Sequence, residues 1–120
     1  MDENGHGTAL ASVAAGSLLN EGLSFASGAA DADLVMVKLR QAKPYLKEFY
    51  GVSQETECYA ESDLLVAIRY LESYAISLYR PLIICMGMGT SMGDHEGHSV
   101  LADYLSSIAL RRSRCVICCV

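Results

Sequence analysis

The stretch Pro81-Leu82-Ile83-Ile84-Cys85-Met86-Gly87 decides the predicted fold class of this 120-residue chain. Five apolar residues stand between a proline and a glycine, without the apolar–polar alternation of a strand that has one face in water. Leu34–Leu39 and Cys115–Val120 are similar short apolar runs. Because such strands are typical of a sheet covered on both faces, the three runs are predicted to form one parallel sheet.

Amphipathic helices are predicted between these strands. After Ser62, a good N-cap residue, apolar residues recur at helical spacing as far as Tyr79, and Pro81 blocks continuation. Ser99 is the expected N-cap of a further helix. The predicted fold class is therefore α/β, a parallel sheet with helices on both faces in a three-layer α/β/α arrangement. Ligands gather at the carboxyl ends of such strands, where the glycine-rich loop from Gly87 to Gly97 follows.

Two other segments have weaker signals. Gly7–Gly16 is a run of small residues with helical propensity, closed by Gly16 as a C-cap. Its small side chains suit a helix packed closely on all sides. Residues 40–61 are polar and aromatic, and they are predicted to be a surface excursion with one helical turn.

Composition excludes several classes of protein. A chain with 52% hydrophobic and 19% charged residues is not disordered, and a net charge of −5 without clusters of Lys or Arg argues against nucleic-acid binding. No stretch approaches the roughly 20 strongly apolar residues of a membrane span, so no membrane partner is expected. The apolar fraction is high for so short a chain, and its last six residues are all apolar. Self-association through sheet edges or bare apolar faces is therefore expected.

The cysteines are odd in number: Cys58, Cys85, Cys115, Cys118 and Cys119. The last four lie in apolar runs. They are predicted to be reduced, buried thiols, which favours a cytoplasmic location. No metal or other cofactor is expected. The pair Cys115/Cys118 lacks the second ligand pair of a zinc site, and the two histidines of Asp94–His98 are three apart rather than four.

His6 lies between two glycines, immediately before the predicted helix. Glycines let backbone and substrate approach closely, and a helix N-terminus favours the neutral form of an imidazole. A neutral imidazole is the form that a general base requires. His6 is therefore a candidate general base, and the alternative is a loop histidine without a chemical role.

Residues 4–16, Asn-Gly-His-Gly-Thr-Ala-Leu-Ala-Ser-Val-Ala-Ala-Gly, resemble the histidine block of the subtilisin-like serine peptidases (subtilases), N-G-H-G-T-x-[VL]-A-[GS]-x-[AI]-A-G. Three later segments also resemble subtilase segments: residues 28–38, 81–89 and 115–120. In the family, these are the strand that ends in Val-Lys, the strand that ends in the substrate-binding S-L-G segment, and the strand before the oxyanion asparagine. Residues 1–120 thus look like an internal fragment of a subtilase catalytic domain.

The resemblance implies that His6 is the general base of a Ser-His-Asp triad, taking the proton of the serine and later giving it to the leaving amine. Gly87, Met88 and Gly89 would bind the extended peptide substrate through backbone groups and form one wall of the specificity pocket. The family's aspartate block lies upstream of its histidine block and its serine block well downstream. Both are expected in the remainder of the catalytic domain, and the fragment alone is expected to be inactive.

Some assignments are rejected or left open. Gly89-Thr90-Ser91-Met92 is similar to a serine block, but a Gly-Asp-His-Glu-Gly run follows it and it precedes the oxyanion strand, so Ser91 is not assigned as the nucleophile. Asp2 is too close to His6 to be the triad aspartate. Residues 41–50 and 89–97 are similar to the clostridial branch that includes the spore germination proteases, and this resemblance implies a spore-internal location as the alternative to the cytoplasm. The alternatives are a pseudoprotease or regulatory scaffold, and a small nucleotide-binding α/β module.

Overall fold

The computed structural model describes residues 4–16, 27–90, 93, 96–111 and 114–118, the last range by its backbone alone. The chain divides into two compact units, Met1–Met36 and Val37–Val120. Each unit is described by itself.

The first unit contains α1, His6–Ala15. The N–H of Gly16 closes the helix on the carbonyl of Ser12, which confirms Gly16 as the C-cap. The following turn is tied to the helix end, because the N–H of Ala29 donates to the carbonyl of Ala14 at 2.9 Å. No residue of α1 is buried, so the expectation of close packing on all sides is wrong. Within the described part of this unit, α1 has no second helix or strand against which its small side chains pack.

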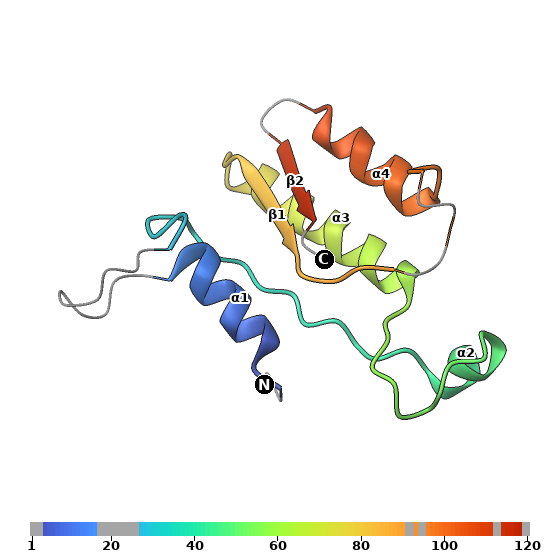
Figure 1. Cartoon of the computed structure of the whole chain (residues 1–120). Helices are drawn as coiled ribbons and strands as arrows, with labels where there is room; N and C mark the ends of the chain where they lie inside the picture. The colour runs from blue at the N-terminus through green and yellow to red at the C-terminus, as the bar shows by residue number, and fades with distance from the viewer. Residues whose placement is uncertain (1–3, 17–26, 91–92, 94–95, 112–113, 119–120) are drawn as a thin grey trace. The chain divides into compact units, whose positions relative to one another are not determined.

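The second unit contains three helices and two strands among its described residues: α2 (Pro44–Phe49), α3 (Glu61–Ser77), β1 (Leu82–Met86), α4 (Val100–Ala109) and β2 (Arg114–Cys118). Figure 1 shows α4 connecting the two strands, which pair in parallel. The register runs from Leu82 opposite Arg114 to Met86 opposite Cys118.

The core of this unit lies on one face of the strand pair. It is formed by buried Ile68 from α3, Ile84 and Met86 from β1, and Ile108 from α4. Partly buried apolar residues pack around these four: Leu64, Leu82, Leu101, Tyr104 and Leu105. Burial along β1 alternates, with Ile84 and Met86 buried and Ile83 and Cys85 exposed. Helices α3 and α4 therefore cover the same face of β1.

The predicted three-layer α/β/α fold is wrong. The regular structure of the described residues is mostly helical, and its strand pairing consists of the two short strands and an isolated antiparallel bridge between Gln41 and Tyr59. Leu34–Leu39, predicted as a strand, is largely exposed and lies outside any strand. A parallel sheet needs cover on both faces, whereas Ile83 is 66% exposed. The apolar run of β1 therefore does not mark a doubly buried strand.

Two predicted helix caps have opposite outcomes. The hydroxyl of Ser99 accepts a hydrogen bond from the N–H of Ala102 at 3.1 Å, which confirms it as the cap of α4. Ser62 is not a cap, because α3 already begins at Glu61 and Ala60 is the N-cap residue. The helix also ends before Tyr79, whose φ of 52° is left-handed. The helical turn expected within residues 40–61 is confirmed as α2.

Candidate functional site

His6 is the first residue of α1, and the residues before it set the start of the helix. Gly5 is the N-cap residue, with a left-handed φ of 78° that a side chain would disfavour. The backbone N–H of His6 donates to the Oδ1 of Asn4 at 3.0 Å, and the N–H of Ala9 donates to the carbonyl of Gly5 at 2.9 Å. His6 is exposed. The local backbone therefore presents the imidazole at the surface, at the positive end of the helix dipole.

Gly87, Met88 and Gly89 directly follow β1 at its carboxyl end, as the sequence predicts. They have no regular secondary structure. Gly87 is half-buried, while Met88 and Gly89 are exposed. A peptide bound through backbone groups needs an accessible segment of this kind.

The two predicted site elements lie in different units of the chain. His6 belongs to the first unit, and Gly87, Met88 and Gly89 belong to the second. Each element is therefore defined by its own local geometry alone.

Several other residues considered above lie outside the described residues: Asp2, Ser91, Asp94, His95 and Cys119, together with the side chains of Cys115 and Cys118. Cys58 is half-buried and Cys85 is exposed, so the prediction of a buried thiol is wrong for Cys85. Exposure follows from the alternation of burial along β1.

No metal centre is found in the part of the chain that the structure describes, where no three His, Cys, Asp or Glu side chains converge. From the stretch Asp94–His98, the described side chains of Glu96 and His98 approach to 3.9 Å between Oε2 and Nδ1, and both are well exposed.

A shallow pocket of about 90 Å³ lies between the N-terminal turn of α3 and residues 40–46. The Nη2 of Arg40 pairs with the Oδ2 of Asp63 at 3.3 Å beside it. Ligand pockets for small molecules measure about 300–1,000 Å³. This pocket is therefore too small to define a substrate site.

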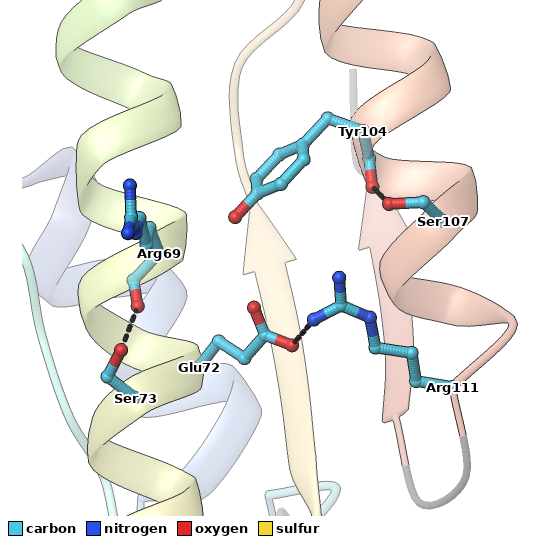
Figure 2. A network of polar contacts seen from close by, with 6 residues as sticks. All are labelled: Arg69, Glu72, Ser73, Tyr104, Ser107 and Arg111. Carbon is cyan, nitrogen blue, oxygen red and sulfur yellow. Dashed lines mark hydrogen bonds and ion pairs between the residues drawn. The ribbon is translucent and has the colours of Figure 1, made fainter.

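Two buried charged residues were not predicted. Glu72 on α3 is buried and pairs with Arg111 after α4, and Figure 2 shows Tyr104 extending from α4 toward the same region. Lys47 on α2 is buried within the excursion that was predicted to be surface structure. A six-residue helix is too short for a hydrophobic period to show which side faces inward, so the sequence carries no signal for Lys47.

Comparison with known proteins gives no family assignment, since no family model, curated protein or solved structure matches the chain. Among the described residues, no helix combines the length and the apolar character that crossing a membrane requires.

Proposed function

We propose that this chain is a segment of a serine endopeptidase of the subtilase type, in which His6 is the general base. The observation that carries the proposal is the start of α1. Gly5 has the left-handed backbone before the helix, and the Asn4 side chain accepts a hydrogen bond from the first helical N–H. His6 then presents an exposed imidazole at the helix N-terminus. The proposal rests on this histidine block and not on the overall fold.

In the proposed mechanism, His6 accepts the proton of a serine nucleophile as it attacks the peptide carbonyl, and later donates that proton to the leaving amine. The serine and the orienting aspartate are expected in the remainder of the catalytic domain. Gly87, Met88 and Gly89 would pair with the extended peptide through their backbone groups. A histidine without its nucleophile and oxyanion hole supplies little rate enhancement, so residues 1–120 alone should not hydrolyse peptides.

The test is fluorophosphonate labelling of the natural protein that contains this sequence. The wild-type protein should be labelled at a serine, and His6→Ala should slow labelling by about 10²–10⁴-fold, the usual contribution of a general base. His98→Ala is the matched control, because it removes another exposed histidine and should label at the wild-type rate.

Two results would contradict the proposal. One is wild-type labelling in a folded His6→Ala protein. The other is the absence of labelling in correctly folded wild-type protein, which would favour the pseudoprotease or scaffold alternative.

A further inference from the structure

Residues 41–59 form an excursion whose two ends meet. Gln41 and Tyr59 are joined by an antiparallel bridge, and the N–H of Ala42 donates to the carbonyl of Cys58 at 2.8 Å. The chain therefore leaves and returns at one place, and helix α2 lies within the closed segment. We refer to residues 41–59 as the closed excursion.

Lys47 is the buried residue of α2 and is only 4% exposed. Its ammonium donates to the carbonyl of Gln54 at 2.9 Å and to the carbonyl of Thr56 at 2.8 Å. A buried ammonium is unfavourable unless acceptors surround it, and hydrogen bonds from a charged donor are stronger than neutral ones. These two bonds therefore explain how a lysine occupies the interior of the excursion.

Two other hydrogen bonds join α2 to the residues that follow it in the closed excursion. The N–H of Val52 donates to the carbonyl of Lys47 at 2.8 Å, and the Nε2 of Gln54 donates to the carbonyl of Pro44 at 3.1 Å. The Gln54 bond and the two bonds of the Lys47 ammonium link α2 to the returning segment 52–56. The Val52 bond closes the end of α2 itself, past Gly51 with its left-handed φ of 67°. A helix of six residues is far below the length at which an isolated helix is stable in water. The returning segment must therefore hold α2 in place.

We propose that Lys47 is an internal pin whose ammonium keeps the closed excursion folded as one local unit, which opens and closes without unfolding α3. Three exposed aromatic side chains, Tyr45, Phe49 and Tyr50, lie on α2 or at its end. Phe49 is 79% exposed, and its ring meets that of Tyr50 edge-on at 5.0 Å. By holding α2 in place, the Lys47 ammonium also holds the backbone that carries these exposed aromatic side chains.

The rate of chymotrypsin cleavage measures how often the closed excursion opens, because this protease cleaves after aromatic residues and needs the local backbone to unfold. In Lys47→Met, cleavage after Phe49 and Tyr50 should be at least about tenfold faster than in the wild-type chain, since two charge-assisted bonds are lost. Lys43→Met is the matched control. It removes the same charge from the same excursion, but among the described residues the contact of the Lys43 ammonium is with the Tyr45 ring, at 5.9 Å from its centre. Its cleavage rate should be unchanged.

The location of any added cleavage decides between a local pin and general stabilisation. Cleavage after Tyr70 and Tyr74 on α3 should keep its wild-type rate in Lys47→Met. Equal acceleration at those sites, equal acceleration in Lys43→Met, or no acceleration after Phe49 would each overturn the proposal.

The wild-type chain provides a second test that does not depend on a variant folding. Timed acetylation with an amine-reactive ester, followed by mass spectrometry, should modify Lys47 at least about tenfold more slowly than Lys43, because Lys47 reacts only when the excursion opens. Equal rates at the two lysines would overturn the proposal.

Discussion

The carboxylate of Glu72 on α3 forms an ion pair with the guanidinium of Arg111, two residues beyond the end of α4, so that a charged contact joins α3 to the segment that follows α4 (Figure 2). The two partners differ in burial. The side chain of Glu72 is 9% exposed, whereas that of Arg111 is 54% exposed. Replacing Arg111 and replacing Glu72 should therefore lower the free energy of unfolding by different amounts.

Arg111→Met should reduce the free energy of unfolding by about 1–3 kcal/mol, because it leaves a buried carboxylate without this partner. Glu72→Gln should cost less, since the half-exposed guanidinium returns to water. Urea unfolding of the two single variants and of the double variant measures both effects and their coupling. Equal costs for the two single variants would contradict this account.

Ile108 is completely buried, whereas Leu110, two residues later, is 88% exposed. Ile108→Ala should lower the free energy of unfolding by about 2–5 kcal/mol through lost burial and a new cavity. Leu110→Ala is the paired control and should change it by no more than about 0.5 kcal/mol. Similar losses in both variants would show that the core is not where the structure places it.

Ser99→Ala removes the hydrogen bond from the Ala102 N–H and leaves that donor at the start of α4 without its cap. The expected loss in the free energy of unfolding is about 1 kcal/mol. Ser62→Ala is the matched control, because Ser62 makes no cap hydrogen bond to α3 and its replacement should be nearly neutral. If Ser62→Ala lowered the free energy of unfolding more than Ser99→Ala does, Ser62 would be the helix cap that the sequence predicts.

Gly5→Ala should weaken the start of α1 through backbone strain alone. A Cβ at this position would meet no atom within 4 Å, but the left-handed φ costs an alanine about 1–2 kcal/mol. The amide of Ala9, bonded to the carbonyl of Gly5, should then exchange with solvent faster. Gly5→Asn should restore most of its protection, since asparagine tolerates this conformation. Identical exchange in Gly5→Ala and wild type would contradict the strain argument.

The chain is expected to associate with itself, because large apolar side chains such as those of Phe49, Ile83 and Leu110 are exposed. Association should strengthen near pH 5.0, the isoelectric point, where the net charge that keeps molecules apart vanishes. Light scattering against concentration at pH 5 and pH 8 measures this. A monodisperse monomer at high concentration at both pH values would contradict the expectation.

Local signals predicted the positions of most helices and of β1, because capping, helical spacing and proline act over a few residues. The hydroxyl of Ser99 and the terminating Gly16 are examples. Leu34–Leu39 was mispredicted because an apolar run becomes a strand only when a distant partner supplies hydrogen bonds. Its composition carries no information about that partner. For the same reason, the apolar sequence of β1 did not show that one of its faces is open.

The candidate site was predictable only as separate motifs. The glycines around His6 indicated a helix start, and the structure has one there. Met88 was placed after a strand for equally local reasons. The buried Lys47 and Glu72 depend on contacts made after the chain folds back on itself, and nothing near them in sequence distinguishes them from surface residues.

The one-sided cover of β1 also affects how the chain responds to heat. Only six hydrophobic residues are buried among those that the structure describes. Unfolding therefore transfers little new apolar surface to water, and the change in heat capacity should fall below the usual value of about 12–15 cal/mol/K per residue. A small heat-capacity change, with the small unfolding enthalpy that accompanies it, gives a broad melting transition and a stability that varies little with temperature.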